Sequence, residues 1–401
     1  MTDDLLATLV AGINEALPEA ASLRRAIHAD PHLSGDESDT RAAVTSMTPW
    51  LDWSPIAETG AFAHIGPAGP SIALRAELDA LPITEDTGVA WASQRRGIMH
   101  ACGHDVHLAA LWALMSASKN VELPAAMVPL LQPREESNPP GATEVVASGF
   151  LDDQDVRAIM GVHVQPQIER GLISASGGAV NAAFDSFEIT VSGRGGHGAY
   201  PHIAIDPISI LAAIVTGLSG ITGREVNPIH PAVLSFGSFQ SGTAPNVIPD
   251  VATCTGTIRT FNEKDRSFLH DAVTRLVEGT AMAHGAAANV TFTRGGPLLL
   301  NNDSLASYTQ DTLEGVGIKL TSEVFRSCGS DDFSEYSQLL PAMMSFVGTG
   351  SVDGVGLHHA RFLPGRDALR LTAITMAASY VAAYDALRDG KLERPGNGKM
   401  T

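Results

Sequence analysis

Cysteine is scarce in this sequence. The 401 residues include three cysteines, at positions 102, 254 and 328. An odd and sparse count does not fit a framework of disulfide bonds of the kind that holds small secreted domains together. We therefore expect the protein to work in a reducing compartment.

Basic residues are also few. Lysine and arginine total 26 against 44 aspartates and glutamates, which leaves a formal net charge of −18. A strongly acidic chain is repelled by phosphate backbones and by anionic lipid surfaces. We therefore expect no nucleic acid and no membrane among its partners.

Long apolar runs are missing as well. No stretch approaches the ~18 residues that a membrane-spanning helix needs. The sequence starts Met1-Thr2-Asp3-Asp4, which lacks the basic start of a signal peptide. These features predict a cytoplasmic protein.

The residues that are present indicate a packed globule. Hydrophobic residues make up 44% of the chain and charged residues 17%, which is typical of folded proteins. A chain of this length exceeds one comfortable core, so two domains are expected. No internal repeat or low-complexity tract is visible.

Continuous apolar runs predict the main domain. Helical spacing of apolar residues predicts helices over 5–28, from about Val106, and over 367–387. Buried strands are predicted between and around them. Such runs separated by helices are typical of an α/β fold with a mostly parallel sheet. The predicted strands are 71–76, 127–131, 158–164 and 343–347.

The middle of the chain has a different pattern. Residues 186–191 alternate with period two, and the elements that follow read β-α-β-β-α-β, the order of a split βαβ unit. We predict an inserted ferredoxin-like α+β domain over 181–294. Residues 1–180 and 295–401 would then form the main domain.

One short segment is rich in metal-binding side chains. Between Met99 and His107 lie the thiol of Cys102, three imidazoles and the carboxylate of Asp105. Thiolate and imidazole are the donors that bind zinc and its first-row neighbours. Cys102 and His104 are two residues apart, so both can face one ion in an irregular turn.

Further polar residues follow or end the predicted strands. They are Asp79, the pair Glu135-Glu136, His163 and His358. Sites in open α/β sheets form at the carboxyl ends of the strands. Mixed Cys, His and Glu ligands gathered there suit two metal ions that share a water, with one of the adjacent glutamates as a general base.

Each of these residues also has a simpler interpretation. His163 would be a hydrogen-bonded core histidine, and the two glutamates a solvated face. Asp79 would cap a turn, and Cys102 would be an inert buried thiol. These alternatives stay open for each residue alone, whereas one metal site explains all of them together.

The inserted domain has its own candidates. The glycine-rich segment 192–202 carries His197 but no Walker-type Lys-Ser/Thr, which excludes a phosphate cradle. Asn246 and Arg259 lie on neighbouring predicted elements. Arg259 would either clamp a carboxylate or form a surface ion pair. In the main domain, His100 and His107 are interpreted as structural or supporting residues.

Several motifs together resemble a known family. The chain is similar to the aminoacylase/carboxypeptidase-type di-metal peptidases, and within them to the N-acyl-L-amino acid amidohydrolase branch of hippurate hydrolases and auxin-conjugate hydrolases. The resemblance runs from Arg24 to Leu369. Its motifs are Met99-His100-Ala101-Cys102-Gly103-His104-Asp105, Gln132-Pro133-Arg134-Glu135-Glu136, Gly193-Arg194-Gly195-Gly196-His197-Gly198-Ala199, Gly329-Ser330-Asp331-Asp332-Phe333 and Leu357-His358.

The resemblance implies a role for each candidate. It implies a di-metal catalytic domain, an inserted lid or dimerisation domain, and a homodimer. Glu135 matches the general acid/base, and Asp79 the carboxylate that orients an active-site group. His197 matches a lid histidine that reaches the developing oxyanion, often across a dimer. Asn246 and Arg259 match the residues that hold the substrate carboxylate. The residues that match the metal ligands are Cys102, His104, Glu136, His163 and His358.

The motifs depart from the family pattern at a few positions. His32 stands where the family usually has glutamate, Glu77 replaces a frequent aspartate, and Ala360 replaces a common proline. Arg134 replaces a small residue before the glutamates. An arginine that faced Glu135 would lower its basicity, so we expect Arg134 to point to solvent.

We therefore predict a metal-dependent amidohydrolase. Its substrate would be an N-acyl amino acid or a small dipeptide-like molecule, and its cofactors two divalent ions of zinc, manganese, cobalt or nickel. Three alternatives remain: a dipeptidase or exopeptidase of the same fold, a metal-dependent binding protein without turnover, and a single closed structural zinc site.

Overall fold

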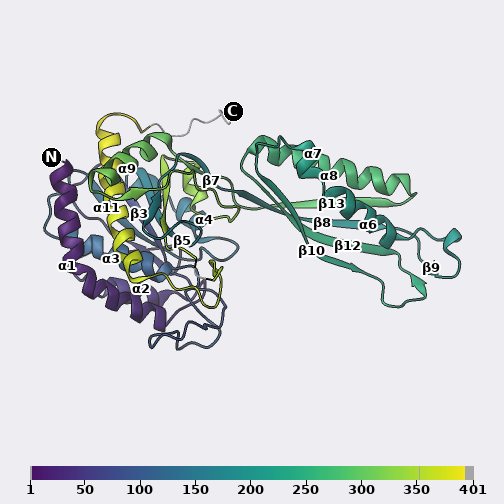
Figure 1. Cartoon of the computed structure of the whole chain (residues 1–401), viewed down its shortest axis with the longest axis horizontal. Helices are drawn as coiled ribbons and strands as arrows, with labels where there is room; N and C mark the ends of the chain where they lie inside the picture. The colour runs from purple at the N-terminus through teal and green to yellow at the C-terminus, as the bar shows by residue number, and fades with distance from the viewer. Residues whose placement is uncertain (1, 352, 393–401) are drawn as a thin grey trace. The chain divides into compact units, whose positions relative to one another are not determined.

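The computed structural model describes residues 2–351 and 353–392, which form two compact units (Figure 1). Within the described residues, the large unit comprises 2–178, 300–325 and 335–392. The small unit comprises 179–299 and 326–334. Each unit has a hydrophobic core of its own. The segment 326–334, which is predicted from the sequence to belong to the main domain, groups here with the small unit.

The large unit is built on an eight-stranded sheet with the order β1-β2-β4-β3-β5-β16-β6-β15. Its four central strands run parallel, as predicted. The four predicted apolar runs form these strands, because an interior strand is buried on both faces. They are β3 (Ser71–Glu77), β4 (Ala126–Gln132), β5 (Val156–Gln165) and β16 (Ala342–Gly348).

Short strands complete this sheet. They are β1 (Ser54–Ile56), β2 (Gly60–Phe62), β6 (Leu172–Ser174) and β15 (Lys319–Leu320). The chain passes between the two units within β7 (Gly178–Asn181) and β14 (Leu299–Asn301), and again near α10 (Ser334–Ser337).

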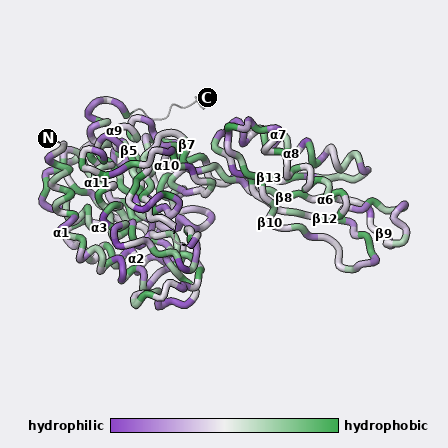
Figure 2. The backbone as a smooth tube through the Cα atoms, viewed as in Figure 1, coloured by the Kyte–Doolittle hydropathy of each residue, from purple (hydrophilic) through white to green (hydrophobic). Residues whose placement is uncertain are grey.

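Three long helices pack together in the large unit: α1 (Thr2–Ala29), α3 (His104–Ser118) and α11 (Arg366–Arg388). Hydrophobic and hydrophilic residues alternate along α1 (Figure 2), and its apolar residues, such as Leu9 and Ile13, are buried. The remaining helices of the unit are α2 (Ser38–Thr45), α4 (Gly141–Ala147), α5 (Phe150–Asp153) and α9 (Asp303–Gly315).

The small unit confirms the predicted split βαβ order. Its antiparallel sheet has the strand order β10-β12-β8-β13, and Asp206 caps the first long helix through the amide of Ile208. The elements are β8 (Ala183–Ser192), α6 (Pro207–Leu218), β10 (Ala232–Ser241), β12 (Val251–Thr260), α8 (Glu263–Ala283) and β13 (Ala287–Arg294). Shorter elements are β9 (Gly196–His197), η1 (Pro201–Ile203), α7 (Ile221–Glu225) and β11 (Val247–Ile248).

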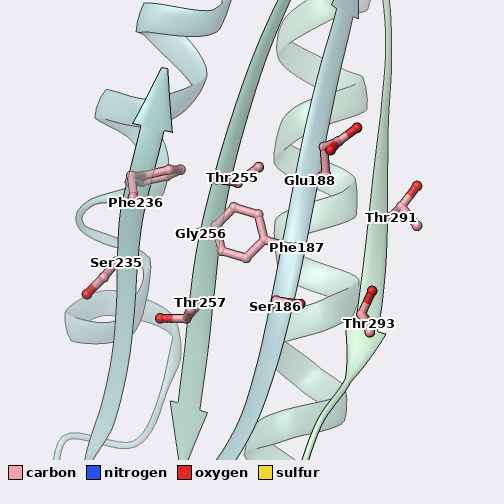
Figure 3. Close-up of a pocket in the computed structure, with 11 residues that line it drawn as sticks. Ser186, Phe187, Glu188, Ser235, Phe236, Thr255, Gly256, Thr257, Thr291 and Thr293 are labelled. Carbon is pink, nitrogen blue, oxygen red and sulfur yellow. The ribbon is translucent and has the colours of Figure 1, made fainter. Parts of the chain in front are cut away.

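One face of the small sheet is covered by α6 and α8, and the other carries hydroxyl groups. Figure 3 shows Ser235, Thr257, Ser186 and Thr293 in a row across four strands, where they line a shallow hollow. None of the predicted site residues lines this hollow. Among the described residues, no helix is long and apolar enough to cross a membrane.

Candidate active site

The predicted site residues of the large unit follow its central strands. β3 ends two residues before Asp79, and β4 ends three residues before Glu135. His163 is the third residue from the end of β5. Because these strands are parallel, their carboxyl ends meet at one edge of the sheet, where α/β proteins build their sites.

A glycine shapes the turn that carries two candidate ligands. Gly103 has a φ of +91°, and a Cβ atom there would lie 2.4 Å from the side chain of Val164. Only glycine adopts this conformation readily. The turn leaves the Sγ atom of Cys102 3.4 Å from Nε2 of His163, and His104 begins α3 directly after it.

Two histidines present the same nitrogen to the site. Nδ1 of His104 donates to the backbone carbonyl of Asp79 over 2.8 Å, and Nδ1 of His163 donates to the carbonyl of Val164 over 2.7 Å. In each histidine Nε2 is therefore the ring nitrogen left to bind a metal ion once it carries no proton. The buried Nε2 of His104 has no hydrogen-bond partner in the described part of the chain. In metal sites, a histidine ligand typically donates a hydrogen bond from its other ring nitrogen, as both histidines do here.

Glu136 and His358 extend this ligand group. The ligand atoms of Cys102, His104 and Glu136 all lie within 4.8 Å of one another. Nε2 of His358 lies 3.2 Å from Oε1 of Glu136. The backbone of His358 is left-handed, with a φ of +61°, and its N–H donates to the carbonyl of Ala101. The loop of His358 is thus tied to the loop of Cys102.

The charges in the site favour a cation. Burial, together with Glu136 and Glu135, raises the pKa of the Cys102 thiol well above its usual value. Burial acts to lower the pKa of His104, but nearby carboxylates, chiefly Glu77, raise it to about 10. Burial lowers the pKa of His163 to about 3, so that imidazole is neutral. A divalent ion would replace protons at these donors, and a thiol, imidazoles and a carboxylate fit zinc or a first-row neighbour.

Asp79 connects two of the candidate ligands. Its carbonyl accepts from His104, while its carboxylate accepts from the hydroxyl of Ser34 at 2.7 Å and from the backbone N–H of Glu136 at 2.9 Å. Oε2 of Glu135 lies 3.9 Å from Nε2 of His104. Glu135 is thus positioned beside the candidate ligands.

His107 is engaged at both ring nitrogens. Nδ1 donates to Glu77 over 2.8 Å, and Nε2 accepts the backbone N–H of Val164 over 3.0 Å. It has no free lone pair for a metal and instead supports the strand end that carries His163. The ring nitrogens of His100 have no hydrogen-bond partner among the described residues, and nothing in the structure explains this.

The structure shows the surroundings of two residues that depart from the family pattern, His32 and Arg134. His32 is buried and lies 3.1 Å from the hydroxyl of Thr40, so its side chain belongs to the packing of α2. The expectation that Arg134 points to solvent is wrong. Its side chain is 14% exposed and forms ion pairs with Glu58 and Glu144, because α4 and the β1–β2 turn both place carboxylates beside it.

The remaining predicted site residues lie in the small unit. Nδ1 of His197 accepts the backbone N–H of Ala199 at 3.1 Å, which leaves a proton for Nε2. His197 pairs with Val247 in the β9–β11 ladder, next to Asn246. The guanidinium of Arg259 lies over the ring of Phe184, with 4.8 Å to the ring centroid, and donates to the carbonyl of Cys328.

Arg259 is remote from His197 and Asn246 within the small unit. β9 and β11 extend beyond the Val251 end of β12 (Figure 1), whereas Arg259 lies near its other end. Eight residues of strand between Val251 and Arg259 span about 26 Å. One chain therefore cannot apply Arg259 and Asn246 to the same carboxylate.

Sequence reasoning missed the residues that support the site. Ser34, Glu37 and the pairing of Glu77 with His107 gave no periodic or motif-like signal. Each acts through a contact between distant parts of the chain, such as the 45 residues that separate Ser34 from Asp79.

A thiol, imidazoles and carboxylates gathered at the carboxyl edge of a parallel sheet fit a metal centre of the kind that metal-dependent hydrolases use. The model of peptidase family M20/M25/M40 matches residues 73–382. The chain belongs to this family, whose members hydrolyse amide bonds, and the resemblance inferred from its motifs is confirmed.

Individual relatives agree with this assignment. The chain is 34% identical to an N-acetyl-L-cysteine deacetylase of Bacillus subtilis over 92% of its length and 89% of that protein. It is 33% identical to a thermostable carboxypeptidase of Saccharolobus solfataricus, over 93% and 98% of the two chains. A solved dinuclear metal-binding peptidase of the M20 family from Bacillus subtilis matches with a TM-score of 0.81 and 30% identity, covering 92% of this chain and 98% of that one.

Proposed function

We propose that this protein is a metal-dependent amidohydrolase that cleaves N-acyl amino acids into a carboxylic acid and a free amino acid. The observation that carries the proposal is the meeting of Cys102, His104, Glu136 and His163 beside Glu135. The relative named as an N-acetyl-L-cysteine deacetylase supports this class of substrate.

Five residues would hold two divalent ions: Cys102, His104, Glu136, His163 and His358. The dinuclear site named for the solved relative supports this number. When bound, the ions would supply Lewis-acid polarisation of the scissile carbonyl and of the attacking water. Zinc, manganese, cobalt and nickel all suit this donor set.

The side chains then divide the proton transfers. Glu135 would accept a proton from the attacking water and deliver it to the leaving nitrogen, so that the amide is replaced by a carboxylic acid and an amine. Asp79 would keep His104 and the amide of Glu136 in place.

Residues of the small unit would recognise the substrate. His197 would donate a hydrogen bond from Nε2 to the developing oxyanion, because its Nδ1 is already an acceptor. Arg259 and Asn246 would bind the substrate carboxylate. Their separation within one chain supports a homodimer in which one copy supplies Arg259 and the other supplies Asn246 and His197.

The main alternative is an exopeptidase or dipeptidase of the same family, which the similarity to a carboxypeptidase favours. A binding protein without turnover is the second. The cytoplasmic location, and the absence of nucleic acid and membrane partners, stay predictions from the composition.

A substrate panel tests the proposal. Metal-restored protein is given N-acetyl, N-benzoyl and longer N-acyl amino acids, matched dipeptides, and the methyl esters that block the carboxylate. We expect release of amino acid from the N-acyl compounds, and a large rise in KM for the esters.

Arg259→Ala should raise KM for the free acids and remove much of their advantage over the esters. Faster turnover of dipeptides than of every N-acyl amino acid would favour the exopeptidase, and wild-type kinetics for Arg259→Ala would remove the carboxylate clamp.

A further inference from the structure

A buried carboxylate, Glu37, lies outside the set of ligands and catalytic groups described above. Its side chain has no solvent exposure, and it directly precedes α2. No cationic side chain in the described ranges forms an ion pair with it. A buried carboxylate without a cationic partner is unfavourable for stability. Residues that cost stability in this way are expected where they are needed for function.

The contacts of Glu37 lead to the turn between β4 and the two catalytic-site glutamates. Oε1 accepts the backbone N–H of Arg134 over 2.9 Å, and Oε2 accepts the hydroxyl of Thr59 over 2.6 Å. Arg134 has a left-handed backbone with a φ of +55°, and it immediately precedes Glu135. The bond therefore reaches the peptide that sets the direction of the next two residues.

The backbone on both sides of the Arg134 Cα atom is held by further contacts. The carbonyl of Arg134 accepts the N–H of Gly141 over 2.9 Å, and a Cβ atom on Gly141 would lie 1.9 Å from the carbonyl oxygen of Pro133. The guanidinium of Arg134 is paired with Glu58 and Glu144. Glu37 thus supplies the only acceptor found for this N–H in the described structure.

We propose that Glu37 is a positioning residue for the reaction, which holds the Arg134 peptide and thereby aims Glu135 and Glu136. The inference rests on the proposed function for its kinetic consequence. Without this acceptor a part-buried N–H is left unsatisfied and the left-handed conformation of Arg134 loses its support. The turn then relaxes, and a displacement near 1 Å at a catalytic group costs about 100-fold in rate.

Substitutions of Glu37 in the full-length, metal-restored protein test the proposal. Glu37→Gln keeps an acceptor for the Arg134 N–H and should keep kcat within about threefold of wild type. Glu37→Leu removes the acceptor. Glu37→Asp keeps a carboxylate, but its side chain is one methylene shorter and does not reach the N–H of Arg134. Both should lower kcat by roughly 10- to 100-fold with little change in KM, and weaken the affinity for one metal ion about tenfold. Thr40→Val, which removes a buried hydroxyl of α2 that contacts His32 instead, is the matched control and should leave both quantities unchanged.

Amide hydrogen exchange provides a readout that needs no turnover. Residues 132–137 should exchange faster in Glu37→Leu and Glu37→Asp than in wild type and in Glu37→Gln. If the wild-type protein hydrolysed no substrate, the proposed function would fail while exchange and metal affinity still tested the role of Glu37. Wild-type exchange, metal affinity and kcat in Glu37→Asp would overturn the inference, even if Glu37→Leu did not fold. A loss in Glu37→Gln as large as in Glu37→Leu would also overturn it, because the charge and not the acceptor would then be required.

Discussion

Nδ1 of His104 lies 2.8 Å from the backbone carbonyl oxygen of Asp79, so the orientation of this imidazole comes from the main chain. The carboxylate of the same aspartate is left to hold the amide of Glu136 at 2.9 Å. Asp79 thus orients two candidate ligands, His104 at the start of α3 and Glu136 in the turn after β4. A residue that orients metal ligands without binding the metal itself is common around metal ions.

Removal of the thiol should weaken metal binding. In Cys102→Ala the cluster loses a ligand that is soft and, with a metal bound, anionic. We expect the affinity for at least one ion to fall tenfold or more, as measured by competition with a chelator. Cys254→Ala, which changes a buried thiol in the core of the small unit, should bind metal as wild type does. Unchanged affinity and stoichiometry in Cys102→Ala would remove this residue from the ligand set.

Loss of the general base should separate metal binding from catalysis. Glu135→Gln keeps the shape of the side chain but cannot take a proton. We expect kcat to fall by about 10²- to 10⁴-fold, with metal content unchanged by elemental analysis. Glu122→Gln, at an exposed position, serves as the control. Turnover near the wild-type rate would show that another group takes the proton.

The turn between the first two ligands should not tolerate a side chain. Gly103→Ala combines a φ of +91° with a clash of 2.4 Å against Val164. We expect a loss of roughly 1–3 kcal/mol in unfolding free energy and weaker metal binding. Gly35→Ala has a similar φ of +89° but open space around it. A loss in Gly103→Ala no greater than in Gly35→Ala would mean that the contact with Val164 does not matter.

His28 should make stability depend on pH above neutrality. Burial acts to lower its pKa, but ion pairs with Asp105 at 3.1 Å and Glu85 at 3.2 Å raise it to about 9. The protonated form is therefore favoured by folding. Its stabilisation is fully present below pH 6.5 and is lost as the pH rises through about 9. A shift of this size corresponds to roughly 3 kcal/mol.

Thermal unfolding of the metal-loaded protein between pH 6 and 10 tests this expectation. The midpoint should fall with rising pH, and the fall should be smaller in His28→Gln. His64→Gln changes an exposed histidine and should follow wild type. Parallel curves for His28→Gln and wild type would contradict the assignment.

The parts of the fold that were predictable have local signals. β3, β4, β5 and β16 are continuous apolar runs. Asp79 and Glu135 follow two of these strands, and His163 lies near the end of a third, at the same edge of the sheet. Asp206 and Pro207 mark the start of α6 by their capping chemistry. Such features can be recognised within a few residues of sequence.

The parts that were missed depend on contacts between distant residues. Glu37 accepts a hydrogen bond from the backbone N–H of Arg134, which is 97 positions away in the sequence. No sequence pattern around either residue predicts this bond. The pairing of Arg134 with Glu58 and Glu144 arises only when the turn of Arg134, the β1–β2 turn and α4 come together. The grouping of 326–334 with the small unit likewise follows from tertiary contacts such as that between Arg259 and Cys328.

The central claim is that this chain hydrolyses amides with bound metal ions. The most direct test measures release of amino acid from an N-acetyl amino acid by chelator-stripped protein, before and after addition of manganese, zinc or cobalt. We predict negligible turnover by the stripped protein and recovery once about two ions per chain are bound. Equal turnover before and after metal addition, or no turnover with two ions bound across the whole substrate panel, would contradict the account.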